Sequence, residues 1–305
     1  MASVNAGINT SSASFLFGSG TIPQVLLALV AGLVLFITLY SFESLVVAFN
    51  GYANSKSVLV PNTSPSSSAI VVVQDPKLPD PKMILASDNE RTGYEFTYSF
   101  FLYVDPATMN TAGDTVDVLK QVFYKGYSKP FPLLGPGVFV RSSTNTMRVF
   151  MNSYKSWYSY VDIPNIPLAK WFHTAIVFRA NNLEVYVNGN MAGRISMEST
   201  APYQNYENLV IFGGNTYDST EATKYKNQGT GDAENFKVGP AIIGQISRLS
   251  YYRYALSFSE IQANVNEGPS SQIDLPAGAS PGSFLNNTLT DSWYTAGSGS
   301  PSATS

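Results

Sequence analysis

The chain has 305 residues, of which 44% are hydrophobic and 13% are charged, and its net charge is −3. An average soluble domain has about 25% charged residues, so this chain carries few charges. Its hydrophobic content is enough to bury a large core. No basic block is present, and we therefore expect no nucleic-acid partner. With no cysteine and one histidine, His173, disulfides, thiol catalysis and multi-histidine metal sites are excluded. The missing cysteines favour assembly in a reducing compartment.

The first predicted element is a single membrane-spanning helix over residues 21–49, preceded by an irregular, uncharged segment over residues 1–20. The run Ile22–Phe42 contains no charged side chain, and at about 1.5 Å per residue it matches a hydrocarbon core of about 30 Å. The alternatives are a buried core helix and a cleaved signal peptide, but a signal peptide needs a basic segment first. Lys56 is the basic residue nearest this run, and it favours a cytoplasmic C-terminal part.

Residues 50–92 are predicted to form a Pro/Ser-rich connector. The stretches Asn62–Ser68 and Asp75–Lys82 are rich in Ser or Pro, which favours extended, semi-rigid spacing. Between them, Ala69–Val73 has the composition of an isolated strand.

Residues 93–268 are predicted to form one all-β, antiparallel jelly-roll sandwich. Short β-rich runs alternate with turn clusters, and no βαβ rhythm occurs. Two hairpin turns are expected, at Asn181-Asn182 and at Asn188-Gly189. The predicted strands are Tyr94–Val104, Val118–Gly126, Gly137–Ser143, Thr146–Asn152, Lys170–Ala180, Leu183–Met197, Glu207–Gly214 and Ile242–Leu256.

A short helix is predicted at Ser257–Asn266, with Ser257 or Ser259 as its cap and Gly268 just past its end. After it, residues 269–305 form a Ser/Gly/Pro-rich extended tail that composition predicts to be disordered.

Several strings in this region resemble the laminin-G-like or concanavalin A-like lectin-glucanase superfamily. A Trp-x-His strand at Trp171–His173 leads to the hairpin Leu183–Gly189, a later strand ends in Gly213-Gly214, and a closing pattern runs from Gly244 through Ile261. The resemblance covers roughly residues 94–268 and implies a concanavalin A-like sandwich. With its N-terminal span, low charge and lack of cysteine, the chain is also similar to membrane-anchored versions of this domain encoded by large DNA viruses of algae or protists.

Catalysis is not expected. Hydrolases of this superfamily carry Glu-x-Asp-x-x-Glu on one strand, because glycoside hydrolysis needs two carboxylates at a fixed separation. That string does not occur, and Glu95 and Glu184 are isolated carboxylates. His173 stands between Trp171 and an apolar run, where we expect a packed, hydrogen-bonded strand residue and not a base.

The candidate contact residues lie in one aromatic stretch, Asn152–Asp162, with Pro202–Tyr206 and Tyr217 as further candidates. Such aromatics occur in protein contacts, in cores and in glycan platforms, and the sequence leaves these three interpretations open. The residues singled out are Asn152, Tyr154, Trp157, Tyr158, Tyr160 and Asp162.

No cofactor is expected, and calcium is the alternative. Calcium takes six to eight oxygen ligands, and the loop over residues 213–235 offers Asp218, Glu221 and Asp232. A second acidic loop spans Asp105–Asp117. Neither loop has a recognisable ligand spacing.

Together these features predict a membrane-anchored structural or interaction protein. In its specific form the hypothesis is a minor capsid or membrane-associated virion protein of a large DNA virus, single-pass in the internal virion membrane and facing the capsid. Its partners would be the membrane and neighbouring structural proteins. The alternative is a glycan-binding, lectin-like adhesion module.

Overall fold

The computed structural model describes residues 21–53, 55–78, 81–87, 94–109, 118–127, 133–156, 159–197, 202–218 and 237–274. The chain divides into two compact units, residues 1–54 and 55–305. The predicted N-terminal segment over residues 1–20 and the tail beyond residue 274 lie outside the described residues.

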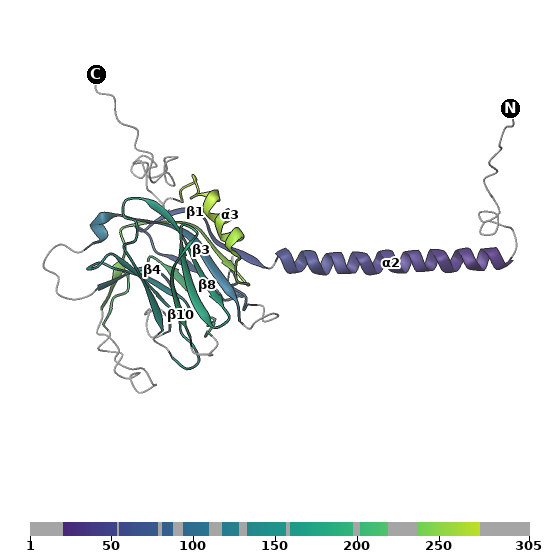
Figure 1. Ribbon diagram of the computed structural model, residues 1–305, viewed down its shortest axis with the longest axis horizontal. Coiled ribbons are helices and arrows are strands. Elements are labelled where there is room, and N and C mark those ends of the chain that lie inside the picture. The colour runs from purple at the N-terminus through teal and green to yellow at the C-terminus, as the bar shows by residue number, and fades with distance from the viewer. Residues whose placement is uncertain are drawn as a thin grey trace, which may run out of the picture. The chain divides into compact units, whose positions relative to one another are not determined.

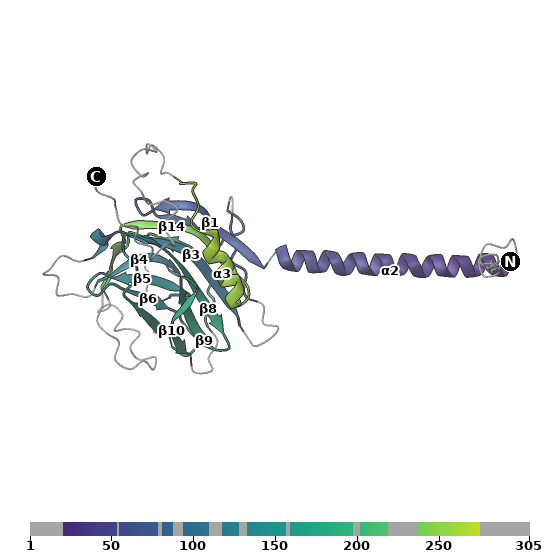
Figure 2. The same cartoon turned by 45° about the horizontal axis from the view of Figure 1, so that its top comes forward.

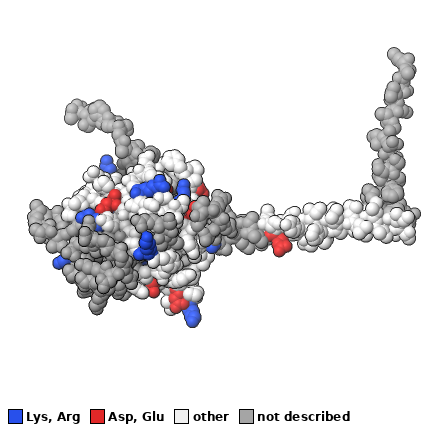
Figure 3. All heavy atoms as spheres, turned by 60° about the horizontal axis from the view of Figure 1, so that its bottom comes forward, with Lys and Arg blue, Asp and Glu red and all other residues white. Residues whose placement is uncertain are grey.

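The first unit contains one helix, α2 (Thr21–Ala53), in which Gln24–Val46 is long and apolar enough to cross a membrane. Glu43 is its only charged residue, and where the helix is described its visible face in Figure 3 carries no other charged side chain. A helix that is apolar on all sides is typical of contact with lipid. The structure thus confirms a long apolar helix where one was predicted, extending four residues beyond residue 49, and makes it a candidate membrane span.

The second unit is a sandwich of two β-sheets, as predicted (Figures 1 and 2). The six strands of the first sheet form what we call sheet A, and the eight strands of the second form sheet B. In spatial order, sheet A consists of β1 (Lys56–Pro65), β14 (Gly244–Tyr252), β3 (Phe96–Val104), β8 (Trp171–Arg179), β9 (Asn182–Val187) and β10 (Asn190–Ser196).

Sheet B is built around β4, which pairs with β5 on one edge. Its other edge is shared by β13, in a parallel pair, and by β11, which pairs in turn with β2. All other pairs in both sheets are antiparallel. The strands of sheet B are β12 (Tyr217–Asp218), β13 (Lys237–Ala241), β4 (Val118–Lys125), β5 (Gly137–Arg141), β6 (Thr146–Phe150), β7 (Tyr160–Pro164), β11 (Leu209–Ile211) and β2 (Ile70–Val72).

The main core lies between the sheets because alternate side chains of each strand point inward. On β3 the buried set is Phe96, Tyr98, Phe100, Leu102 and Val104, and it meets side chains of sheet B. The sheet B contribution includes Val122, Phe123, Val138, Val140, Met147 and Val149.

The two predicted hairpins form β8–β9–β10. Asn188 and Gly189 have φ of 48° and 80°, the left-handed conformations that a two-residue type I′ turn requires. The first turn lies one residue earlier than expected: Ala180 and Asn181 carry positive φ, while Asn182 pairs with Arg179.

The predicted C-terminal helix is α3 (Phe258–Glu267), and Ser257 caps it in a capping box with Glu260. A short 3-10 helix, η1 (Pro106–Thr108), follows β3. Ile261 of α3 is buried with Ala175, Val177 and Tyr252, so α3 packs on the outer face of sheet A. Figures 1 and 2 both show α3 against strands of this sheet.

The predicted connector over residues 50–92 is wrong in two places, because β1 and β2 belong to the sandwich. Pro61 and Pro65 are unusual within a strand, since proline cannot donate to a ladder. However, β1 is an outer strand of sheet A, and its ladder is irregular between Val60 and Thr63, where Pro61 lies. The expected start of the tail at residue 269 is also too early: Thr63 bonds the backbone of Gln272 and Asp274.

Candidate binding surface

Four tyrosine side chains are exposed on loops at the end of the sandwich where β4 and β6 terminate. Tyr127 follows β4, Tyr154 lies between β6 and β7, and Tyr203 and Tyr206 precede β11. Tyr206 is 84% exposed and Tyr154 69%, and the rings of Tyr154 and Tyr203 pack edge to face with centroids 5.2 Å apart. We call these four residues the tyrosine rim.

Asn152 ties two of these loops together from inside. Its backbone carbonyl accepts the N–H of Tyr203 at 2.8 Å, and its side-chain Oδ1 accepts the backbone N–H of Leu134. Ser153 forms a β-bridge with Pro202 beside it. Asn152 is buried, so this predicted contact residue positions the rim and does not present itself to a partner.

Lys125, the last residue of β4, holds the segment before β11 that carries Tyr203 and Tyr206. Its ammonium group is buried and donates to the carbonyls of Asn205 at 2.7 Å and Glu207 at 2.6 Å, while the Asn205 amide donates to the Lys125 carbonyl at 3.0 Å. Burial lowers the pKa of Lys125 to about 8, against the opposing effect of the Glu207 charge. The segments that carry Tyr154, Tyr203 and Tyr206 are therefore held in place before any partner arrives.

The cavity behind the rim is too small for a ligand. It has a volume of about 20 Å³ and is lined by Tyr98, Tyr251, Lys125 and Tyr206. This is room for about one water molecule. Contact at this end of the sandwich would therefore be made by exposed aromatic side chains and not by a deep pocket.

The outer face of sheet B adjoins the rim through the β6–β7 loop. Its strand register sets Phe139, Arg148 and Asp162 opposite one another, and Phe150 opposite Tyr160. Arg148 Nε and Nη2 each lie 2.7 Å from a carboxylate oxygen of Asp162, and the guanidinium sits 3.9 Å from the centre of the Tyr160 ring. Such a two-pronged, stacked arrangement is specific to arginine.

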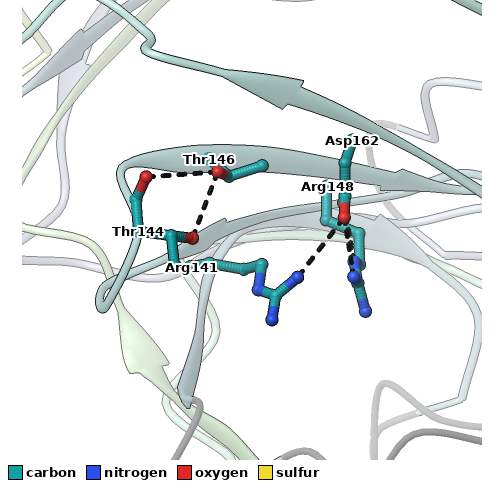
Figure 4. Close-up of polar contacts among 5 residues, drawn as sticks. All are labelled: Arg141, Thr144, Thr146, Arg148 and Asp162. Carbon is teal, nitrogen blue, oxygen red and sulfur yellow. Dashed lines mark hydrogen bonds and ion pairs between the residues drawn. The ribbon is translucent and has the colours of Figure 1, made fainter.

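Much of this face is buried. The Arg148 side chain is 1% exposed, and Tyr124, Phe139 and Phe150 are equally inaccessible. Asp162 keeps 31% of its side chain exposed, and Arg141 approaches it at 3.4 Å (Figure 4). Arg148 therefore orients the Asp162 carboxylate, which is left with exposed surface that can accept a hydrogen bond from a partner.

The described residues of the predicted contact stretch lie in two places. Tyr154 belongs to the rim, Tyr160 and Asp162 lie on the face of sheet B, and Trp157 and Tyr158 lie outside the described residues. Sequence reasoning missed Arg148 and Lys125. Arg148 had a signal, because it stands at an outward position of an alternating strand, whereas nothing in the sequence distinguished Lys125.

The calcium hypothesis stays a prediction. Asp218 lies in β12 opposite Lys237, and Glu221 and Asp232 fall outside the described residues. In the second acidic loop, Asp105 Oδ1 accepts the Ala107 N–H at 2.8 Å and caps η1. Within the described residues, no three acidic or histidine side chains are grouped to hold a metal ion.

Two of the residues weighed for catalysis, His173 and Glu184, lie on the outer face of sheet A, and Glu95 directly precedes β3. His173 is fully buried as expected, its Nε2 lies 2.8 Å from Ser99 Oγ, and burial lowers its pKa to about 4. Glu184 is buried, and it accepts a hydrogen bond from the Tyr186 hydroxyl at 3.0 Å and faces Arg194 at 3.6 Å.

Comparison with known proteins gives one family. Residues 80–262 match the family model described as "Concanavalin A-like lectin/glucanases superfamily". No curated protein matches the chain in sequence.

Among solved structures, the chain is similar to the botulinum neurotoxin serotype D binding domain, with 12% identity and a TM-score of 0.43 over 70% of this chain and 41% of that one. It is also similar to the binding domain of Paraclostridial Mosquitocidal Protein 1, with 14% identity and a TM-score of 0.41 over 70% of this chain and 46% of that one. The chain spans less than half the length of either structure.

Proposed function

The chain belongs to the concanavalin A-like lectin/glucanases superfamily, and we propose that it is a membrane-anchored, non-catalytic binding protein that holds a partner with its tyrosine rim. The exposure of Tyr127, Tyr154, Tyr203 and Tyr206 carries this proposal, together with the contacts that hold the segments of Tyr154, Tyr203 and Tyr206. Tyrosine is enriched at protein interfaces because it offers a large, rigid contact area with little entropy to lose. Because these held segments are already ordered, they cost little further ordering on binding.

Three observations support a binding role in place of catalysis. The sequence lacks the paired-acid string of the superfamily's hydrolases. Glu184 is engaged by Tyr186 and Arg194. On the outer face of sheet B, Phe139, Arg148 and Phe150 are buried, so these aromatic rings do not offer an exposed platform for a polysaccharide.

In its specific form, the partner is a neighbouring structural protein, and the chain is a minor capsid or membrane-associated virion protein that links an internal viral membrane to the shell. The resemblance to membrane-anchored viral versions of this domain motivates this form. The candidate membrane span and the low charge support it, because a contact with few charges relies on packing and not on electrostatic steering.

Cross-linking followed by mass spectrometry on purified particles tests this form. The chain should be present, and peptides from the tyrosine rim should cross-link to a shell protein. A Tyr154→Ala/Tyr206→Ala double variant should lose most of that cross-linking. Ile243→Ala is the matched control, because it removes an exposed apolar side chain outside the rim, beside the last residue of β3, Val104. Particles that lack the chain would exclude the viral role, and rim variants that cross-link normally would exclude the rim.

Glycan binding is the second candidate, favoured by a superfamily that includes lectins and by the exposed Tyr154–Tyr203 ring pair. Exposed aromatic rings stack on sugar faces, and Asp162 could accept a sugar hydroxyl. The full-length protein in detergent should then bind discrete glycans on an array, and Tyr154→Ala should abolish that binding. Array binding that is unchanged by Tyr154→Ala would exclude the rim as a glycan site.

A further inference from the structure

A polar cavity of about 170 Å³ lies against the outer face of sheet A, between β1, β3, β14 and α3. We propose that it is an anion site that takes a phosphate group. Its volume exceeds what a single water molecule needs. The polar side chains that line it are Lys56, Ser99, Arg248, Ser250, Asn264 and Glu267.

The charges at this cavity favour an anion. Arg248 Nη1 pairs with Glu267, whereas its Nε is buried and has no acceptor among the described residues. The Lys56 ammonium lies 5.3 Å from the centre of the Tyr252 ring and forms no ion pair with a described residue. Two cations therefore face one carboxylate. A buried guanidinium N–H without an acceptor is costly, and an anion oxygen would satisfy it.

Hydroxyl and amide groups complete a set of donors on several sides. Asn264 Nδ2 donates to Ser99 Oγ at 3.3 Å, and the Tyr252 hydroxyl donates to Asn264 Oδ1 at 3.3 Å. His173, which bonds Ser99, is neutral because burial lowers its pKa to about 4, so it adds no charge. Donors converging from three strands and a helix fit a tetrahedral phosphate, which offers several oxygens, better than a planar carboxylate.

The backbone turns Arg248 toward this cavity. Arg248 has φ of 52°, and it lies at a bulge in β14 where Arg248 and Leu249 together face one residue of β3. A bulge takes a side chain out of the regular alternation of a strand. Left-handed φ is strained for a residue with a Cβ, and such strain is found most often at functional sites. The strained backbone at Arg248 thus directs its side chain into the cavity.

The phosphate can come from a lipid headgroup or from a soluble compound. Only two residues separate Lys56 from Ala53, the last residue of α2, so a membrane that holds α2 would be a nearby source of phosphate. The chemistry of the site is the same in both cases, and the source is a matter for experiment.

The first test is calorimetric titration of inorganic phosphate into the full-length protein in nonionic detergent, at constant ionic strength because salt screens such sites. Wild type should bind with saturable heat. Lys56→Gln and Arg248→Gly should each bind at least tenfold more weakly, and glycine at the left-handed position keeps the backbone unstrained. Lys170→Gln, an exposed lysine outside the cavity, should bind like wild type. The proposal would be overturned if wild type showed no saturable binding, or if both cavity variants bound phosphate as tightly as wild type.

The second test separates the two sources. The full-length protein is placed in nanodiscs of phosphatidylcholine alone or with added phosphatidic acid, and the phosphate titration is repeated. If phosphatidic acid prevents phosphate binding, the lipid headgroup occupies the cavity. If phosphate binds equally in both nanodiscs, the site serves a soluble phosphorylated compound. The Tyr154→Ala/Tyr206→Ala variant should bind phosphate normally, so failure of the rim proposal would not be mistaken for failure of this one.

Discussion

Replacing His173 by glutamine should make the protein's stability less sensitive to acid. His173 is the chain's single histidine, and it is fully buried with Nε2 2.8 Å from Ser99 Oγ and its ring centroid 5.0 Å from that of Phe101. Burial disfavours the charged imidazolium and lowers the pKa from 6.5 to about 4.

The size and sign follow from proton linkage. Between pH 6.5 and pH 4 the unfolded chain takes up a proton on His173 that the folded chain does not, so the free energy of unfolding falls as the pH falls through this window. At about 1.4 kcal/mol per pH unit, the loss that is complete below pH 4 is about 3 kcal/mol. Above pH 6.5 the contribution is absent.

Urea unfolding followed by tryptophan fluorescence, on the full-length protein in detergent, measures this. The difference in unfolding free energy between wild type and His173→Gln should shrink by about 3 kcal/mol from pH 7 to pH 4, because only wild type carries the linked proton. Carboxylates titrate in both proteins and cancel in the difference. A difference that stays constant over this range would show that the His173 ring is charged or solvated in the folded state, and would refute the reasoning.

Three further outcomes are expected. Lys125→Met removes the donor to the buried carbonyl of Asn205 and the partly buried carbonyl of Glu207. It should lower the unfolding free energy by about 1–3 kcal/mol and weaken partner binding at the rim, which a thermal melt and a pull-down measure. Arg148→Met should cost about 1–3 kcal/mol, less than a fully buried pair because Asp162 is partly exposed, and adding Asp162→Asn should recover part of it in a double-mutant cycle. Gly189→Ala, at φ of 80°, should cost about 1–2 kcal/mol by chemical denaturation, whereas Gly214→Ala, which meets open space, should cost almost nothing.

Features encoded within a few neighbouring residues were predictable. Asn188-Gly189 specified its turn because both residues tolerate positive φ, and Ser257 with Glu260 specified the start of α3. The alternation of Leu183, Val185 and Val187 placed β9 correctly with its inner face toward the core.

Features that depend on distant residues were not predictable. β1 contains two prolines, and only its place at an outer position of sheet A makes them acceptable. The tyrosine rim brings Tyr154 beside Tyr203 through a bridge between Ser153 and Pro202, about fifty residues apart in sequence. The role of Lys125 depends on burial, which its local sequence does not reveal.

The pairing of β1 with β14 has a consequence for how the protein is made. The ladder joins residues 56–65 to residues 245–252, and Thr63 also bonds the backbone of Gln272 and Asp274. During synthesis the apolar helix leaves the ribosome first, while β1 waits for about 180 more residues before its neighbour exists. Sheet A therefore closes only after residues 245–252 have been made, so the nascent chain must keep an unpaired, β-forming segment next to its candidate anchor until then.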